Sequence, residues 1–355
     1  MGIVKKIGLT LAVIIGVLVM MIVINPQIRP SHTEPYLALA GESSTAAPAE
    51  TDILQRVILY GDAGHSTIDP WQASMEKVSQ RASISPQKTA VVALGDNIYM
   101  QGYPQKEEGQ EVWDEDQLES ISFLDSQLKI AKESGASLYL VPGNHDWYAT
   151  ELESQAAHIE AYAEEHGVTT EFHPLLVGDI PTPTATHRDG VSLVYIDSEW
   201  LLRSASPERE LMLSQLEQLL DESRQLHPAN LIIINAHHPL ETMGPHGGYL
   251  AEFVYWFLMK AIFLVFPEAA TEDTYDPLYQ TMIADLHRVM GQHKRIFYAA
   301  GHEHSMQVFR HSNPTSTGPE YTLVSGAGNS NKVSGVWHTP NTRMALSQEG
   351  FLELN

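Results

Sequence analysis

The sequence contains no cysteine. Disulfide bonds and thiolate metal sites are therefore excluded, because both need cysteine sulfur. The absence does not assign a cellular compartment, since an exported bacterial protein can fold without disulfides. The 17 histidines stand in contrast, because several of them cluster in short motifs.

Basic residues are also scarce. The chain has 21 lysines and arginines against 44 acidic residues, which gives a formal net charge of -23. A surface this acidic argues against nucleic acid as a partner. It does not attract anionic substrates over a long range either, so a phosphate site would need local positive charge. The simplest interpretation of the acidic excess is solubility.

Long apolar runs are rare, but one lies near the N-terminus. Residues 7–24, IGLTLAVIIGVLVMMIVI, approach the roughly 20 residues that a membrane-spanning helix needs. Lys5 and Lys6 precede the run and favour a cytoplasmic N-terminus, with the rest of the chain outside the cytoplasm. We interpret residues 1–25 as an uncleaved signal anchor. A cleaved signal peptide, which would give a secreted protein, is the alternative.

Composition divides the remaining chain into two parts. Residues 26–52 are rich in Pro, Ser, Ala, Thr and Glu, which predicts a flexible linker. In residues 53–355 apolar runs alternate with helical patterns, which predicts an α/β sheet, and length alone allows one large domain or two. An apolar content of 43% fits a globular protein with a sizeable core.

Five short apolar runs in this domain end in polar side chains. Each run has the length of a buried strand, and sites in α/β sheets form beyond the carboxyl ends of strands. Any one of these endings alone is typical of a turn or a helix cap. Together they supply carboxylates, a phenol, a carboxamide and imidazoles, which suits two metal ions that share a bridging carboxylate. The polar residues at the five ends are Asp62; Asp96, Asn97 and Tyr99; Asn144, His145 and Asp146; His237 and His238; and His302 and His304.

In these five motifs the sequence resembles the calcineurin-like metallophosphoesterases, and within them the purple acid phosphatase type. That type is recognised by GDxG, GDxxY, GNH(D/E), VxxH and GHxH. The chain has GDAG at 61–64, GDNIY at 95–99, GNHD at 143–146, INAH at 234–237 and GHEH at 301–304. Only the fourth motif departs from the pattern, with Ile in place of Val. The resemblance implies that residues 53–355 form one large catalytic domain with an α/β fold, a β-sandwich of two mixed sheets flanked by helices.

The first motif carries Gly64 where other branches of the superfamily have a metal-binding histidine. The resemblance implies that Tyr99 takes the place of that missing ligand. A phenolate is a hard anionic donor, so Fe(III) is the expected ion at the first site. The alternative interpretation of Tyr99 is an aromatic side chain that covers the core at a strand end.

The resemblance also implies the full set of metal ligands. The first ion would take Asp62, Asp96, Tyr99 and His304. The second ion would take Asp96, Asn144, His237 and His302, and the sequence leaves Zn, Mn and Fe(II) open for it. The resemblance implies hydrolysis of a phosphomonoester, with a metal-bridging hydroxide that attacks phosphorus.

Two histidines are candidates for direct contact with the substrate. His145 directly follows the ligand Asn144 and is the leading candidate for the general acid that protonates the leaving oxygen. Asp146 either orients His145 or accepts hydrogen bonds within a turn. His246 lies nine residues after His237 and resembles a substrate-facing histidine of the plant-type enzymes. His238 precedes a proline and fits a structural role, and His65 fits either an indirect role at the site or simple exposure.

Other activities on the same scaffold stay open. A phosphodiesterase or pyrophosphatase that acts on nucleotide or lipid-linked phosphates would use the same metals. A catalytically silent, membrane-tethered binding module is disfavoured, because none of the expected ligands is missing. Nothing in the sequence favours a particular oligomeric state.

A second apolar stretch, residues 249–266, lies between the fourth and fifth motifs. It contains Glu252 and Lys260, which makes it a poor membrane span. A single crossing there would also separate motifs that must meet at one site. A buried helix is one interpretation. The other is an interfacial helix that lies on a bilayer or covers an apolar substrate.

Overall fold

The computed structural model describes residues 35–38, 48–148, 152–177, 180–247, 272–311, 318–329, 331 and 333–355. The predicted anchor, most of the predicted linker and the apolar stretch 249–266 lie outside the described residues. Within the described residues, no helix combines the length and the apolar character that a bilayer crossing requires.

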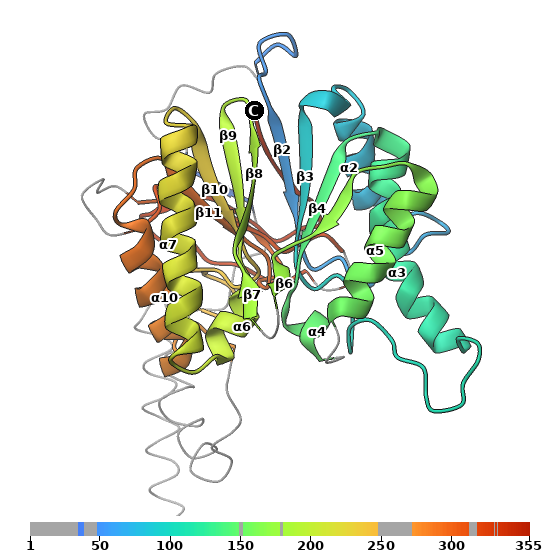
Figure 1. Cartoon of the computed structure of the whole chain (residues 1–355). Coiled ribbons are helices and arrows are strands. Elements are labelled where there is room, and N and C mark those ends of the chain that lie inside the picture. The colour runs from blue at the N-terminus through green and yellow to red at the C-terminus, as the bar shows by residue number, and fades with distance from the viewer. Residues whose placement is uncertain are drawn as a thin grey trace, which may run out of the picture.

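Two mixed sheets carry the architecture (Figure 1). One has five strands in the order β15-β2-β3-β4-β5, and the other has eight in the order β1-β14-β12-β13-β11-β10-β9-β8. The strands of the five-stranded sheet are β2 (Arg56–Tyr60), β3 (Thr89–Leu94), β4 (Ser137–Val141), β5 (Thr170–Phe172) and β15 (Leu352–Leu354). Those of the eight-stranded sheet are β1 (Tyr36–Leu37), β8 (Thr184–Arg188), β9 (Val191–Tyr195), β10 (Leu231–Asn235), β11 (Ile296–Ala300), β12 (Met306–Arg310), β13 (Tyr321–Ser325) and β14 (Thr342–Leu346).

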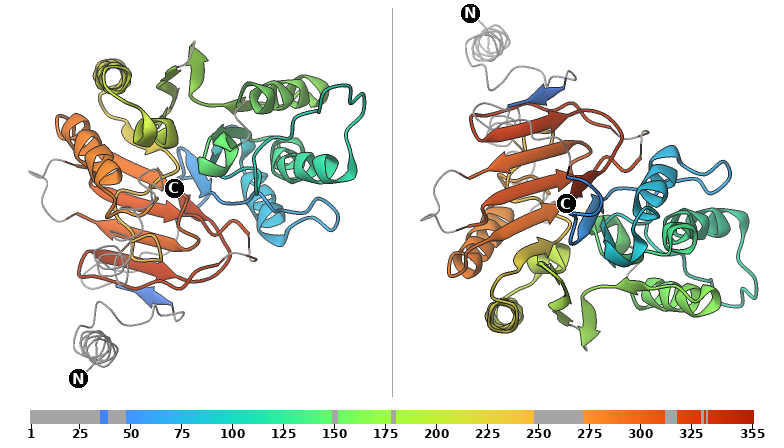
Figure 2. Two further views of the ribbon diagram at one scale, coloured as in Figure 1. Left: turned by 90° about the horizontal axis from the view of Figure 1, so that it is seen from below. Right: turned by 90° about the horizontal axis from the view of Figure 1, so that it is seen from above.

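Helices cover the outer face of each sheet (Figure 2). On the five-stranded sheet these are α2 (Ala73–Ala82), α3 (Glu115–Ser134) and α5 (Leu152–His166). On the eight-stranded sheet they are α6 (Ser198–Arg203), α7 (Glu208–Leu226) and α10 (Pro277–Met290). Each sheet forms an apolar core with its own helices. A further core lies between the two sheets, where Leu59 and Val92 pack with Leu193 and Ile233. The predicted sandwich of two mixed sheets flanked by helices is therefore confirmed.

The local sequence explains the main elements. β2 and β3 are buried along their whole length, as expected for parallel strands covered on both faces. α3 begins at an Asp114–Gln117 capping box and ends at Gly135, whose φ of 74° is a left-handed conformation that glycine adopts without strain. Its buried residues Ile121, Leu124, Leu128 and Ala131 recur at helical spacing. The remaining elements are the short helices α4 (Asn144–Trp147) and η2 (Pro86–Lys88) and the hairpin of β6 (Leu175–Val177) and β7 (Ile180–Thr182).

The topology places all five polar strand ends at one end of the sandwich. β2, β3 and β4 run parallel to each other, and so do β9, β10 and β11. α4 and α6 follow the carboxyl ends of β4 and β9, and both lie at the lower end of the molecule in Figure 1. The polar motifs of the two sheets consequently face each other across this end.

Candidate metal centre

Three predicted ligands of the first ion lie within hydrogen-bonding distance of one another. The Tyr99 hydroxyl donates to Asp62 Oδ1 at 3.1 Å and lies 3.2 Å from His304 Nε2. His304 Nε2 is 3.3 Å from Asp62 Oδ1. The loops after β2, β3 and β11 thus bring a carboxylate, a phenol and an imidazole to one point.

A second group forms beside the first. His237 Nε2 lies 3.0 Å from Asn144 Oδ1 and 3.4 Å from Asp96 Oδ1. The ring of His302 packs against that of His237 with centroids 5.1 Å apart. Ligand atoms of Asp62, Asp96 and His237 all lie within 4.8 Å of one another, so Asp96 stands between the two groups.

Hydrogen bonds fix which imidazole nitrogen is available in the second group. His237 Nδ1 lies 2.8 Å from the Leu94 carbonyl, and His302 Nε2 lies 3.0 Å from the Glu272 carbonyl. A carbonyl only accepts, so these two nitrogens carry the protons. His237 Nε2 and His302 Nδ1 remain as donors to a metal, which is the usual arrangement of ligating histidines.

The buried carboxylates of the centre provide negative charge that bound cations would neutralise. Asp62 and Asp96 are 1% and 2% exposed, and in the described part of the chain their ion-pair partners are histidines rather than lysine or arginine. Burial lowers the pKa of His237, but the charges of Asp96 and Asp62 outweigh it and raise that pKa. Burial, followed by Asp62 and Asp96, raises the pKa of the Tyr99 phenol well above its usual value. A phenolate at Tyr99 therefore needs a strong cation beside it.

The backbone is strained at the same place. Asp62, Asp96 and His302 have φ values of 60°, 52° and 63°, in the left-handed region that non-glycine residues rarely adopt. Three of the four such residues in the described ranges are thus predicted ligands. Strain of this kind persists where the surroundings enforce it, and it clusters at functional sites.

Gly64 and Tyr99 are packed together. A Cβ atom on Gly64 would lie 2.6 Å from the Tyr99 nitrogen, so no side chain fits at this position. The Gly64 carbonyl accepts the Tyr99 N–H at 3.0 Å. The loop that delivers the phenol therefore occupies the space that a side chain at residue 64 would need.

His145 borders the centre. Its Nδ1–H donates to the Met100 carbonyl at 2.7 Å, its ring contacts Tyr99 edge-on, and its Nε2 lies 3.9 Å from Asp96 Oδ2. The Asp146 carboxylate accepts four hydrogen bonds from groups other than the His145 ring. The donors are Gly143 N, Asn97 N and Nδ2, and Gln155 Nε2. This arrangement favours the second of the two roles considered for Asp146, an acceptor that holds the turn.

His246 lies against the second group. Its ring packs on His302 with centroids 4.3 Å apart, and its Nδ1 lies 3.2 Å from Asp273 Oδ1. Burial lowers the pKa of His246, but the hydrogen bond to Asp273 and the nearby carboxylates raise it to about 9. The buried Glu303 carboxylate accepts the His246 backbone N–H at 3.0 Å and so holds the loop in place.

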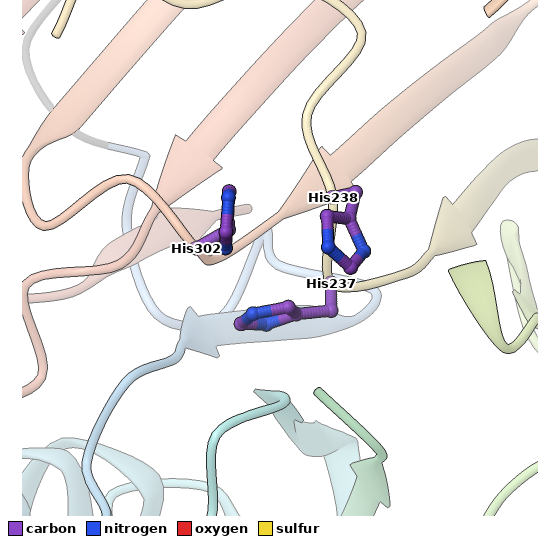
Figure 3. A group of neighbouring side chains, drawn as sticks. All are labelled: His237, His238 and His302. Carbon is purple, nitrogen blue, oxygen red and sulfur yellow. The ribbon is translucent and has the colours of Figure 1, made fainter. Parts of the chain in front are cut away.

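His238 and His65 also contact the centre, and a ligand atom of His238 lies within 4.8 Å of ligand atoms of both His237 and His302. His238 lies beside His237 and His302 (Figure 3), and its Nδ1 lies 3.0 Å from the Ser198 hydroxyl. Ser198 Oγ already accepts two backbone N–H groups, so its proton goes to His238 Nδ1. The ring of His65 packs on Tyr99 and Phe123, with centroid distances of 5.0 and 5.4 Å.

Sequence reasoning missed several polar residues that support the centre. Glu303 lies within the fifth motif, and Tyr148 lies two residues after the third. Their closeness to these motifs could have indicated that they lie near the centre. Arg203 and Glu272 lie far from every motif in the sequence. They join the site through long-range contacts, which leave no local pattern.

Comparison with known proteins identifies related chains. A sequence model of the calcineurin-like phosphoesterase family matches residues 56–306. No curated protein matches the chain in sequence. Among solved structures, GAP50, the anchor in the inner membrane complex of Plasmodium, is similar over 84% of this chain and 80% of its own, with 16% identity and a TM-score of 0.50. The purple acid phosphatase PPD1 from yellow lupin (Lupinus luteus) seeds is similar over 92% of this chain, with 13% identity and a TM-score of 0.51. The similarity spans only 50% of the lupin enzyme, and at these identities both likenesses show the fold alone.

Proposed function

The chain belongs to the calcineurin-like phosphoesterase family, and from that membership we propose that it is a phosphomonoesterase of the purple acid phosphatase type. The observation that carries the proposal is the convergence of seven predicted ligands, from five strand ends, on two adjoining groups. The family supplies the reaction class, metal-dependent hydrolysis of a phosphoester. The monoester substrate and the acid phosphatase type belong to the proposal.

The proposed ligands divide between two ions. Asp62, Tyr99 and His304 would hold the first, proposed as Fe(III), and Asn144, His237 and His302 the second, proposed as Zn, Mn or Fe(II). Asp96 would contact both. When bound, the ions would supply Lewis acidity toward the phosphate oxygens and lower the pKa of water.

The protein's own groups would handle the leaving oxygen. Hydrolysis forms a bond from a water oxygen to phosphorus and breaks the ester P–O bond, so the leaving oxygen needs a proton. The Met100 carbonyl holds the Nδ1–H of His145, which leaves Nε2 toward the centre. We assign the proton donation to Nε2–H of the doubly protonated His145 ring, which passes this proton to the leaving oxygen and keeps the Nδ1–H that is bound to the Met100 carbonyl. His246, fixed by Asp273 and packed on His302, would contact a phosphate bound at the second group.

The proposed function is tested on the full chain, purified in detergent. We expect metal-dependent hydrolysis of p-nitrophenyl phosphate, much slower cleavage of bis(p-nitrophenyl) phosphate, and loss of activity and metal in Asp96→Asn. Faster cleavage of the diester would replace the monoesterase by a phosphodiesterase. Inactivity of the metal-loaded chain on both esters would contradict the catalytic proposal.

The role of His145 has its own test. His145→Ala is expected to lower kcat by about 100-fold or more for an alkyl phosphate, since general acid catalysis contributes roughly 10²–10⁴-fold. The loss is expected to be smaller for p-nitrophenyl phosphate, because p-nitrophenolate leaves without a proton. His166→Ala, at the far end of α5, is the matched control. Equal losses on both substrates would remove the assignment.

We also propose that residues 1–25 anchor the chain in a membrane, with the catalytic part outside the cytoplasm. The apolar run and the preceding Lys5 and Lys6 support this orientation. The anchored chain should resist alkaline carbonate extraction and dissolve in detergent, and protease added outside intact cells or spheroplasts should degrade it. Release by carbonate, or protection of the catalytic part, would contradict the proposal.

A further inference from the structure

α6 lies directly behind the second ligand group. Ser198 Oγ, in its first turn, accepts the N–H groups of His237 and His238 at 3.1 and 2.9 Å. Glu199 is buried, with its Oε2 3.5 Å from His238 Nε2. α6 therefore fixes the backbone of one predicted ligand while contributing no ligand of its own.

Arg203 extends this support from α6 to a second segment of the chain. Its Nε donates to Glu199 on the same helix, and its Nη2 donates to Glu272 Oε1 at 2.7 Å. Glu272 is 69 residues away in sequence, and its backbone carbonyl accepts the Nε2–H of His302 at 3.0 Å. The guanidinium thus holds the residue that orients His302.

A second branch leads from Glu272 to Asn144. The Asn144 amide donates to the Tyr148 hydroxyl at 3.2 Å, and that hydroxyl donates to Glu272 Oε1 at 3.5 Å. Two predicted ligands of the second ion are therefore connected to Glu272, one through its backbone and one through its carboxylate. The first group is held differently, since Asp62, Tyr99 and His304 contact one another.

We propose that Arg203 is a positioning residue for the second metal ion, acting through Glu272 on His302 and Asn144. The inference rests on the ligand assignment of the proposed function. Groups that orient metal ligands commonly contribute 10- to 100-fold to metal affinity. An alternative role for an arginine beside a phosphate site is to bind the substrate directly. Here both Nε and Nη2 are engaged by carboxylates, which favours the positioning role.

The test is a titration of the metal-free full chain with Zn²⁺, followed by calorimetry. We expect Arg203→Met to weaken the binding of one of the two Zn²⁺ ions about 10- to 100-fold and to leave the other unchanged. Glu272→Gln is expected to weaken the same ion, and the double variant should lose little more than either single one, because the two residues act in one chain of contacts. Arg288→Met is the matched control, since Arg288 pairs with Glu210 and Asp285 away from the centre.

The outcomes separate the inference from its premise. Binding of two Zn²⁺ ions to the unchanged chain supports the proposed function. The role of Arg203 is tested only by the ratio of the Zn²⁺ affinities of the variant and the unchanged chain. If both ions bind to Arg203→Met and to Glu272→Gln as tightly as they bind to the unchanged chain, the positioning role is overturned. Unchanged Zn²⁺ affinity together with weaker inhibition by inorganic phosphate would also overturn it, and would make Arg203 a substrate-binding residue. The unfolding temperature of each metal-free variant shows that a loss is not misfolding, and Glu272→Gln carries the test if Arg203→Met does not fold.

Discussion

Tyr99 is the residue whose chemistry most distinguishes this centre. Its phenol lies between Asp62 and His304, and burial with two carboxylates disfavours the phenolate. A trivalent cation reverses this balance, because its charge stabilises the anion. The proposed Fe(III) at the first site and the buried phenol therefore depend on each other.

With iron at the first site, we expect the full chain to show a broad visible absorption band from tyrosinate-to-iron charge transfer. Tyr99→Phe should remove this band while the second ion stays bound, because Asn144, His237 and His302 are unchanged. Absorption spectra and metal content of both proteins check the prediction. A band that survives in Tyr99→Phe would show that another group binds the iron.

Gly64→Ala tests the packing between residue 64 and the phenol loop. The new methyl group would lie 2.6 Å from the Tyr99 nitrogen and 2.8 Å from the Asp96 carbonyl oxygen. Both are backbone atoms, so relief requires movement of the loop that carries two predicted ligands. We expect a loss of about 1–3 kcal/mol in the free energy of unfolding and a weakened or shifted iron band. Gly109→Ala is a comparison site with open space, although its φ of 85° adds strain of its own. A Gly64→Ala protein as stable as the unchanged chain would contradict the packing argument.

At the scale of elements, β15 closes the five-stranded sheet. It pairs antiparallel with β2, and Glu353 on it accepts from the buried Arg56 at 3.2 Å and from Arg81 of α2 at 2.7 Å. The last strand of the described chain is thereby tied to the first strand of its sheet. Burial raises the pKa of Glu353, but hydrogen bonds from Arg81 and Asn355 and the charges of Arg81 and Arg56 outweigh it and lower the pKa below the usual 4.5.

The lowered pKa of Glu353 predicts the pH dependence of stability. The carboxylate stabilises the fold above the unfolded pKa of about 4.5, and this contribution disappears as the pH falls through the lower folded pKa. Glu353→Gln should therefore cost about 2 kcal/mol at pH 7 and progressively less as the pH falls below 4.5. Urea unfolding at several pH values checks this, with the exposed Glu164→Gln as control. A pH-independent difference would show that packing, not charge, accounts for the loss.

Elements differ in how well the sequence predicts them. β2, β3, β4, β10 and β11 were predictable because each is a short apolar run with a polar end, and α3 because its apolar residues recur with helical spacing. The joining of β15 to β2 was not, since strand partners follow from the tertiary fold. The same holds for the contact of Arg203 with Glu272, which joins residues far apart in the chain. The candidate ligands were found through their motifs, whereas the residues that hold them needed the structure.

At the scale of the whole molecule, the candidate centre joins the two sheets. Asp62, Asp96 and Asn144 follow strands of the five-stranded sheet, whereas His237, His302 and His304 follow strands of the eight-stranded sheet. Contacts between these polar groups join the sheets at this end, together with the hydrogen bond from the Trp147 indole N–H to Asp197 Oδ2. Cations shared by both sets would link the sheets and neutralise two buried carboxylates.

Removal of metal should therefore destabilise the entire fold. A ligand present at about 1,000 times its Kd adds about 4 kcal/mol to the free energy of unfolding. For a domain of this size, that corresponds to a rise of roughly 6 °C in Tm. Thermal unfolding of the full chain with Zn²⁺ and with a chelator checks the prediction. Asp96→Asn, which removes the carboxylate between the two groups, should abolish most of the difference while the chelated protein keeps its Tm or gains stability, because a buried like charge beside Asp62 has been removed. An equal metal-dependent rise in both proteins would show that the ions bind elsewhere, and the sheets would then be held at this end without them.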